Sequence, residues 1–278
     1  MPAPGKKNPG SAGGLAGGSA PPPPPPPPRT LRQATLPFGT TTSKKAAGPQ
    51  GRRPAAPPFH PPPGALDLGH GARLLYLPAA IPDADGAILR ALETEVEWLQ
   101  RDVTVWGRTV PQRRLVAYQA RPLAQPYSYS GLALPPTPWT PAVAAIKAAV
   151  EAAAGCAFDT CLLNLYRDGT DAMAWHADGD ALYGPPPTTI ASASFGADRA
   201  FQLRPTPAGV ADGSSAIPAS RIELTLGGGD VLLMQGTTQR DWQHAVPPRA
   251  RVGGVRVNLT FRATAAFKEL QRREAGAP

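Results

Sequence analysis

Acidic residues, cysteines and long apolar runs are each scarce in this sequence, and each shortage narrows what the protein can be. The first 64 of its 278 residues contain no Asp or Glu, although they carry eight Lys or Arg residues and 19 of the 37 prolines. Such a segment has few large apolar side chains and cannot bury enough surface to offset the entropy lost on ordering. We therefore predict a disordered, Pro/Gly-rich basic tail over residues 1–64, which accounts for the whole net charge of +8. Residues 65–278 are long enough for one folded domain with its own core.

The shortage of apolar runs and of cysteine excludes two further classes of protein. No run reaches the roughly 20 apolar residues of a membrane-spanning helix, because Lys147 and Glu151 interrupt the Ala-rich stretch at 142–154. The N-terminal residues also lack the apolar core of a secretory signal. The two cysteines, Cys156 and Cys161, are too few for a disulfide framework. We expect both to be buried thiols in a reducing compartment, and we expect no contact with a membrane.

The basic tail has several alternative functions. Its cationic side chains would attract phosphates without sequence preference, and an acid-poor segment that bears arginines is also typical of an organellar transit peptide. The run Pro21–Pro28 favours an extended polyproline helix, which would be either a spacer or a ligand for an aromatic groove. Residues Gln33–Phe38 are similar to peptides that dock on sliding clamps, although the aromatic residue comes one position early. A weak clamp contact is therefore an alternative to a plain linker.

Two segments of the folded part have the apolar spacing of a helix. The first begins at Asp83, a suitable N-cap, and repeats apolar residues on one face as far as Val96. In the second, Thr140 can cap the helix, Pro141 fits its first turn and Gly155 can end it. Strand-like runs separated by Gly, Pro and Asp clusters follow: Leu162–Tyr166, Thr189–Phe195, Ala200–Leu203, Arg221–Leu226, Val231–Met234 and Val255–Phe261. Helices followed by many strands predict an α+β domain built on a β-sandwich or barrel.

Histidine is scarce enough to be informative. Of the four histidines, His60 and His70 lie in or beside the tail, which leaves His176 and His244 for the body of the domain. His176 lies two residues before Asp178, and in an extended segment two such side chains point the same way. Together with His244 they would present two imidazoles and one carboxylate to one face of a metal, which is typical of non-haem Fe(II) oxygenases. A simple His–Asp hydrogen bond is the alternative.

The segment at 256–262 reads Arg-Val-Asn-Leu-Thr-Phe-Arg and alternates strictly between polar and apolar residues. As a strand it would place four polar residues on one face: Arg256, Asn258, Thr260 and Arg262. Two arginines on an inward face are costly unless their charges are paired, and a dicarboxylate ligand would pair both. Asn164 and Tyr166 are also two residues apart and could add neutral donors. An exposed edge strand with arginines as gatekeepers is the alternative.

Taken together, these motifs resemble those of the AlkB-type Fe(II)/2-oxoglutarate dioxygenases. The resemblance rests on four motifs in the order in which the family has them: Asn164-Leu165-Tyr166, His176-x-Asp178, His244 and the segment at 256–262. Further stretches are similar to the eukaryotic DNA-repair branch of this family: Tyr127–Gly131, Ala191–Gly196 and Asp241–His244. The resemblance extends from about Ile81 to Arg262 and leaves the tail uncovered.

The resemblance implies a double-stranded β-helix, a jelly-roll barrel buttressed by helices. It implies that Fe(II) is bound by His176, Asp178 and His244. It also implies 2-oxoglutarate as co-substrate, with its far carboxylate bound by Arg256, Asn258 and Tyr166. Arg262 and Asn164 would approach the carboxylate next to the keto group. The reaction would use O₂ to hydroxylate an N-methyl group and would release succinate, CO₂ and formaldehyde, which restores the base.

An enzyme of this kind has to take the base out of the stack, and a flipped base packs against aromatic side chains. By resemblance, Tyr127 and Tyr129 would stack on the base, with the His176 ring opposite; ordinary core or hairpin aromatics are the alternative. Trp106 lies where duplex-active members carry an aromatic finger that fills the gap left by the base. A Trp beside a glycine is equally suited to a turn.

Charged residues near this finger complete the expected substrate contacts. Arg108, Arg113 and Arg114 would meet phosphates, with a solvated hairpin as the alternative. One position departs from the family pattern. Many repair members have a second acid directly after the metal-binding Asp, whereas here Gly179 stands in that place and the acid is displaced to Asp180. This departure leaves open the preference between adenine and cytosine.

The sequence therefore predicts a monomeric dioxygenase that demethylates 1-methyladenine and 3-methylcytosine in DNA. An RNA demethylase with the same mechanism is one alternative. A catalytically idle nucleic-acid-binding or scaffold module is another, although an idle site has no physical need for several inward polar groups. The Lys/Arg pairs of the tail favour the nucleus, with an organelle as the alternative.

Overall fold

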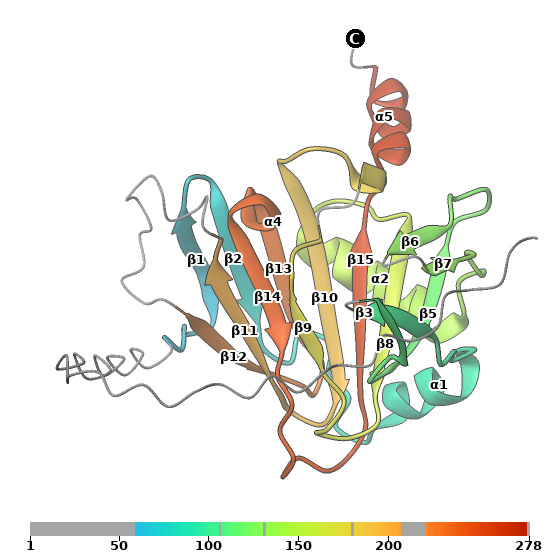
Figure 1. The fold of residues 1–278 in the computed structure, drawn as a ribbon. Coiled ribbons are helices and arrows are strands. Elements are labelled where there is room, and N and C mark those ends of the chain that lie inside the picture. The colour runs from blue at the N-terminus through green and yellow to red at the C-terminus, as the bar shows by residue number, and fades with distance from the viewer. Residues whose placement is uncertain (1–58, 106, 130–131, 179–180, 207–220, 277–278) are drawn as a thin grey trace, which may run out of the picture. The chain divides into compact units, whose positions relative to one another are not determined.

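The fold consists of two antiparallel sheets with helices packed on one of them (Figure 1). The computed structural model describes residues 59–105, 107–129, 132–178, 181–206 and 221–276. The larger sheet has seven strands, in spatial order β1 (Gly64–Gly69), β2 (Ala72–Leu77), β13 (Asp230–Gly236), β10 (Thr188–Gly196), β15 (Arg256–Arg262), β8 (Thr160–Tyr166) and β5 (Leu115–Ala120). The smaller sheet has four: β12 (Ile222–Leu226), β11 (Arg199–Pro205), β14 (Trp242–Val246) and β9 (Met173–His176).

Short hairpins and helices complete the described elements. The hairpins pair β3 (Asp102–Val105) with β4 (Arg108–Pro111) and β6 (Tyr127–Tyr129) with β7 (Leu132–Leu134). The helices are α1 (Ala87–Glu95), α2 (Pro141–Ala154), α4 (Thr238–Asp241), α5 (Ala265–Glu274) and the 3₁₀ turn η1 (Ala181–Tyr183). Two facing antiparallel sheets with a helical buttress confirm the predicted α+β jelly-roll.

Apolar side chains fill two main layers. One lies between the helices and the seven-stranded sheet, and it includes Leu92 of α1, Ile146 of α2 and Leu163 of β8. The other lies between the two sheets and includes Leu203 and Leu232. The larger sheet is therefore buried on both faces, and any charge on its strands must be paired within the protein or by a ligand.

Strand β15 lies in the middle of this larger sheet, between β10 and β8. Its three apolar residues pack into the helix-side core: Val257, Leu259 and Phe261. The opposite face carries Asn258 and Thr260, and the terminal residues Arg256 and Arg262 are only 1% and 3% exposed. The predicted alternation is confirmed, and the edge-strand alternative for this segment is wrong.

Both predicted helices form, although one begins later than expected. Helix α2 begins and ends as predicted, and Gly155 closes it in the left-handed conformation with a φ of 66°. Helix α1 begins at Ala87 rather than at Asp83, because the chain makes a left-handed turn just before it. The Asp83 carboxylate still caps the helix, since it accepts hydrogen bonds from the backbone N–H groups of Ile88 and Leu89 at 2.8 and 3.0 Å.

Three smaller expectations can be compared with the structure. Cys161 is buried on β8, but Cys156 is exposed, because it lies in the turn that follows α2. Phe59, within the segment assigned to the tail, is paired with the backbone of the domain, since its N–H donates to the Arg221 carbonyl at 2.9 Å. Among the described residues, no helix is long and apolar enough to cross a membrane.

Candidate active site

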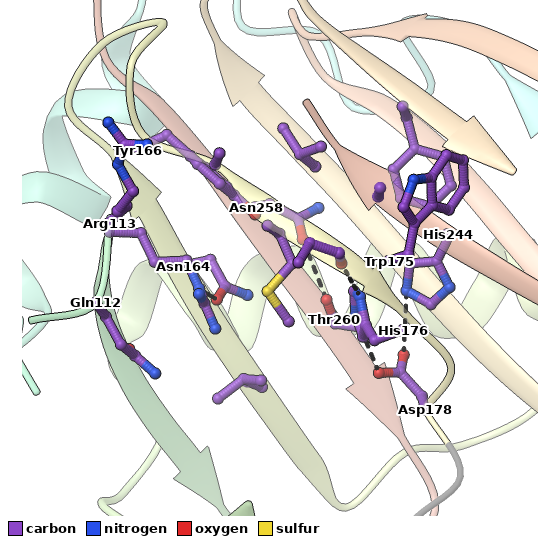
Figure 2. Close-up of a pocket in the computed structure, with 18 of the residues that line it drawn as sticks. Gln112, Arg113, Asn164, Tyr166, Trp175, His176, Asp178, His244, Asn258 and Thr260 are labelled. Atoms are coloured by element: carbon purple, nitrogen blue, oxygen red, sulfur yellow. Dashed lines mark hydrogen bonds and ion pairs between the residues drawn. The ribbon is translucent and has the colours of Figure 1, made fainter. Parts of the chain in front are cut away.

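A cavity of about 860 Å³ opens between the two sheets. Figure 2 shows the side chains that line it. The larger sheet contributes Asn164, Asn258 and Arg262, and the smaller sheet contributes His176 and His244. The fold thus brings polar motifs that are separate in the sequence to the wall of one cavity.

His176, Asp178 and His244 point toward one another in the cavity wall (Figure 2). Strands β9 and β14 are antiparallel neighbours in which the two histidines are paired directly, and the ring centroids lie 4.2 Å apart. The Nε2 atoms of His176 and His244 lie 3.7 and 3.9 Å from the two carboxylate oxygens of Asp178. The three ligand atoms all lie within 4.8 Å of one another. This spacing suits one metal ion with ligand bonds of about 2 Å and leaves its other coordination positions open.

Hydrogen bonds from neighbouring groups orient two of these ligands. The Nδ1 atom of His176 lies 2.8 Å from the carbonyl oxygen of Ala174; as a donor there, it leaves the Nε2 lone pair facing Asp178. The backbone N–H of Asp178 donates to the side-chain oxygen of Gln239 at 2.8 Å. Gln239 comes from α4 and is 8% exposed. The sequence analysis missed it, and the only available signal was its position five residues before His244.

Arg262 controls the charge of Asp178. Its Nη2 atom lies 2.8 Å from the Oδ2 atom of Asp178, and both side chains are buried. Burial raises the pKa of Asp178, but the opposing effect of Arg262 and of the two histidines is stronger, so this pKa lies well below its usual range. The carboxylate is therefore ionised, as a metal ligand must be.

His244 is held in its neutral form. Burial, together with the neighbouring His176, lowers the pKa of His244 from 6.5 to about 3. The ring also stacks on Phe201, with the centroids 5.3 Å apart. A neutral imidazole is the form that binds a metal ion. His244 therefore has the protonation state that a metal ligand needs.

Arg256 is buried without a carboxylate partner among the described residues. Its Nη2 atom donates to the Ser194 hydroxyl at 2.9 Å, but its Nε and Nη1 atoms have no hydrogen-bond partner in the described part of the chain. The guanidinium lies 5.3 Å from the ring centroid of Tyr166, and burial lowers the pKa of Arg256. Unmade hydrogen bonds on a buried charge are costly. The site therefore fits a carboxylate ligand that accepts hydrogen bonds from this arginine.

A second buried arginine, Arg199, supports the same region and was not found from the sequence. It is 2% exposed, and its guanidinium lies 5.5 Å from the Tyr166 ring centroid. It donates to the backbone carbonyls of Asp168, Asp171 and Pro247 at 2.9, 2.7 and 3.0 Å. Arg199 therefore fixes the segment that joins β8 to β9 and leads to the metal ligands.

The residues predicted to meet phosphates lie in different surroundings. Arg108 is exposed on β4, and Arg113 is exposed and lines the cavity, as does the half-buried Tyr127. Arg114 departs from the expected exposed position: it is 5% exposed, and its Nε donates to the Asn164 side chain at 2.7 Å. It begins the buried segment that continues into β5, so its side chain turns inward to the cavity.

Several predicted contacts lie outside the described residues. These are the finger residue Trp106, the departure at Gly179, the displaced acid Asp180 and the clamp-like segment Gln33–Phe38. Only the backbone of Tyr129 is described, within β6. These assignments stay predictions.

A jelly-roll with two histidines, one carboxylate and a buried, unpaired arginine defines a non-haem iron oxygenase site that takes a carboxylate co-substrate. The sequence model of the 2OG-Fe(II) oxygenase superfamily matches residues 74–262. The chain belongs to this superfamily, and its cofactors are Fe(II) and 2-oxoglutarate.

Curated relatives narrow the family further. The "DNA oxidative demethylase ALKBH2" of Arabidopsis thaliana is 35% identical over 214 residues, which cover 71% of this chain and 68% of that protein. The "Alpha-ketoglutarate-dependent dioxygenase alkB homolog 3" of Rattus norvegicus is 39% identical over 176 residues, which cover 63% of this chain and 58% of that protein. The alignment thus spans less than two thirds of the second relative. The predicted resemblance to the DNA-repair branch of the AlkB-type dioxygenases is confirmed.

A solved structure also matches the chain. "The structure of OsALKBH1" aligns with a TM-score of 0.44 and 20% sequence identity, and the alignment covers 72% of this chain and 99% of that one.

Proposed function

We propose that this protein oxidatively demethylates 1-methyladenine and 3-methylcytosine in DNA. It would use Fe(II), 2-oxoglutarate and O₂ and release succinate, CO₂ and formaldehyde. One observation carries the proposal: His176, Asp178 and His244 form one cluster in the cavity, and strand β15 lines the same cavity. This strand also carries the buried Arg256, whose Nε and Nη1 donors have no hydrogen-bond partner among the described residues. The relatives named as DNA oxidative demethylases support DNA as the substrate.

Each side chain has a role that follows from its contacts. His176, Asp178 and His244 would hold Fe(II), which with 2-oxoglutarate and O₂ supplies the oxidation of the N-methyl carbon. Arg262 keeps Asp178 ionised and in place through their 2.8 Å contact. Arg256 would bind the far carboxylate of 2-oxoglutarate through charge-assisted hydrogen bonds, because its Nε and Nη1 donors have no partner among the described residues.

The remaining polar groups would orient the co-substrate. Asn258 is itself fixed, since its Nδ2 donates to the Ser192 hydroxyl at 2.8 Å and its Oδ1 accepts from Thr260 at 3.1 Å. Asn164 is fixed by Arg114 on the opposite side. Groups held in this way need little rearrangement on binding, so the methyl carbon can be positioned accurately.

The substrate base would enter beside Tyr127, which lines the cavity. A flipped base stacks on aromatic rings, and the exposed Arg108 and Arg113 lie on the nearby hairpin region, where they could contact phosphates. After hydroxylation, the N-hydroxymethyl group would lose formaldehyde and restore the unmodified base. We keep Trp106 as the proposed finger for duplex substrates.

The first test is reconstitution with Fe(II) and 2-oxoglutarate without oxygen, followed by admission of O₂ in the presence of a 3-methylcytosine or 1-methyladenine oligonucleotide. Mass spectrometry should show the loss of one CH₂ unit per lesion, with stoichiometric succinate. The His244→Ala protein serves as the control and should form neither product. If succinate forms and a methylated RNA is demethylated while the DNA is not, RNA would replace DNA as the proposed substrate. No succinate with any methylated oligonucleotide would overturn the enzyme assignment in favour of an idle binding module.

The proposal extends to the setting of the enzyme. We propose a monomer with a weak sliding-clamp contact through Gln33–Phe38. The Lys/Arg pairs of the basic tail favour the nucleus as its location. Imaging of a fluorescent fusion separates the nucleus from an organelle. A clamp pull-down with Phe38→Ala as the control tests the contact.

A further inference from the structure

Tyr183 lines the cavity but has no part in the chemistry above. It ends η1, is 4% exposed, and follows the metal-binding segment in the chain. Its backbone carbonyl accepts a hydrogen bond from the Lys268 side chain at 2.9 Å. The next residue, Gly184, has a φ of 73° and packs so closely on α5 that a Cβ there would lie 3.4 Å from the Cβ of Ala265. Helix α5 therefore contacts the backbone from which the Tyr183 side chain projects.

The hydroxyl group of Tyr183 is buried and has no hydrogen-bond partner among the residues that the structure describes. Most buried polar groups in proteins are paired, and an unpaired one reduces stability. Burial raises the pKa of Tyr183 above its usual range, so the group stays an O–H donor. An unused donor in a cavity wall indicates a ligand with an acceptor atom at that place.

The position of the ring shows which part of the cavity this donor faces. The Arg262 guanidinium lies 5.3 Å from the Tyr183 ring centroid and pairs with Asp178 on another side. Arg262 and Arg256 are at opposite ends of β15, with backbones about 20 Å apart at 3.3 Å per residue. Tyr127 and Asp178 also act electrostatically on the Tyr183 hydroxyl. Tyr183 thus lies at the end where the metal ligands and the proposed base-stacking residue meet, away from Arg256.

We propose that the Tyr183 hydroxyl donates a hydrogen bond to a carbonyl oxygen next to the methylated nitrogen of the substrate base, and thereby determines which lesion the enzyme prefers. This rests on the proposed demethylase function. A neutral donor suits an uncharged acceptor such as a carbonyl oxygen, and because the hydroxyl itself is buried, water does not replace a missing partner.

The methylated bases differ in what flanks the methylated nitrogen. In 3-methylcytosine that nitrogen lies between a carbonyl and an exocyclic amine, whereas in 1-methyladenine it lies between a C–H group and an amine. In 3-methylthymine it lies between two carbonyls. Only the two pyrimidine lesions have a carbonyl oxygen next to the methylated nitrogen, so at that place the adenine lesion would leave the buried O–H unpaired. The expected preference is therefore for the pyrimidines.

The Tyr183→Phe variant tests this, because it removes the hydroxyl and keeps the ring against Arg262. In a reaction with mixed oligonucleotides, kcat/KM for 3-methylcytosine should fall about tenfold relative to 1-methyladenine. A 3-methylthymine oligonucleotide should show the same relative fall. The matched control is Tyr76→Phe, whose hydroxyl lies 3.3 Å from Asp230 and does not line the cavity. It should leave the ratio unchanged.

Three outcomes separate this inference from its alternatives. An unchanged ratio in a Tyr183→Phe protein with the wild-type Tm would overturn it. A weaker affinity for 2-oxoglutarate with equal losses on both lesions would assign the hydroxyl to the co-substrate and overturn it as well. If the wild type demethylates no base, the proposed function fails, and anaerobic binding of the same oligonucleotides still decides the inference. The inference is then supported if the wild type binds the 3-methylcytosine oligonucleotide more tightly than the 1-methyladenine oligonucleotide and Tyr183→Phe removes this difference. Equal wild-type Kd values for the two oligonucleotides would contradict it.

Discussion

The two sheets around the cavity hold their functional side chains in different ways. Arg256 and Arg262 belong to β15, which pairs with a neighbour on both sides and is covered by the helix-side core. His176 belongs to β9, an edge strand whose pairing with β14 is interrupted by a register shift. Main-chain pairing therefore fixes the arginines, whereas side-chain contacts such as those of Gln239 and Arg262 are needed to fix Asp178. Rigidity in this site comes from two sources, and each can be tested by itself.

The largest expected effect separates binding from stability within β15. Replacing Arg256 by Leu should raise the Kd for 2-oxoglutarate by about a hundredfold, because about two charge-assisted hydrogen bonds are lost. It should not lower the free energy of unfolding of the apo-protein, since the arginine has no carboxylate partner among the described residues to leave behind. Leu259→Ala, on the opposite face, should instead cost about 3 kcal/mol of unfolding free energy and leave the Kd of the folded protein nearly unchanged. Anaerobic calorimetry and urea unfolding measure the two quantities. Equal destabilisation by both variants would contradict the division of roles.

The second prediction concerns pH and the smaller sheet. In the unfolded chain His244 takes up a proton as the pH falls through 6.5, whereas in the folded protein its pKa is about 3. Between these values the unfolded chain binds more protons, so stability decreases as the pH falls, by about 1.4 kcal/mol per pH unit. The lowered pKa of Asp178 adds a further loss only in more acidic solution. Urea unfolding of the metal-free protein between about pH 6 and 4 measures the slope.

A matched pair of variants tests whether His244 causes this pH dependence of stability. His244→Leu should flatten it, because the titrating group is gone. His60→Ala, at an exposed position, should retain it. A slope that persists in His244→Leu would show that other groups cause the acid sensitivity.

A smaller effect is expected at Gln239, which holds the backbone of the metal ligand Asp178. Gln239→Leu removes the acceptor for the Asp178 backbone N–H, so affinity for Fe(II) or for Co(II) as a spectroscopic probe should fall about tenfold. Thr238→Val, on the same short helix, is the control. The Thr238 hydroxyl donates to the carbonyl of Gln235 near the end of β13 at 2.6 Å and does not contact a metal ligand. If both variants weaken Co(II) binding equally, the effect belongs to α4 as a whole. That result would remove Gln239 from the site.

The smallest effect is expected at the start of α5, which supports Tyr183. The Thr264 hydroxyl accepts a hydrogen bond from the Phe267 backbone N–H at 3.1 Å and donates to Asp159 at 2.6 Å. Thr264→Ala should cost about 1 kcal/mol of unfolding free energy, measured by urea unfolding. Thr264→Ser keeps both contacts and should stay close to the wild type. A Ser variant as unstable as the Ala variant would show that the lost methyl group, and not the cap, is responsible.

Prediction from the sequence succeeded where the signal was local and periodic. The alternation of 256–262 marked both faces of β15, and the cap and glycine of α2 marked its ends. Strands β9 and β14 were not predicted, since they are short and mix polar with apolar residues: Met173–His176 and Trp242–Val246. Their chemistry was recognisable from the histidines, but their pairing is a long-range contact that no local pattern encodes.

The side chains that the sequence analysis missed, or in the case of Arg114 assigned to the surface, share one physical reason. All three residues are polar and buried: Arg199, Arg114 and Gln239. The sequence pattern around them does not indicate whether they are buried or exposed. Their partners are backbone carbonyls, a backbone N–H or side chains from other parts of the chain. A buried polar residue is stable only with such partners, and these are assembled only when the sheets meet.

The sequence by itself determined the donor types of the site: two histidines and one carboxylate for the metal, and arginines on an alternating strand for a carboxylate ligand. These follow from residue chemistry and from the two-residue period of a strand. Only the tertiary structure decided which charges are paired. It placed Arg262 against Asp178, left Arg256 without a carboxylate among the described residues and buried the Tyr183 hydroxyl in the cavity wall. Pairing depends on distance and on the exclusion of water, and both are properties of the packed sheets rather than of the chain.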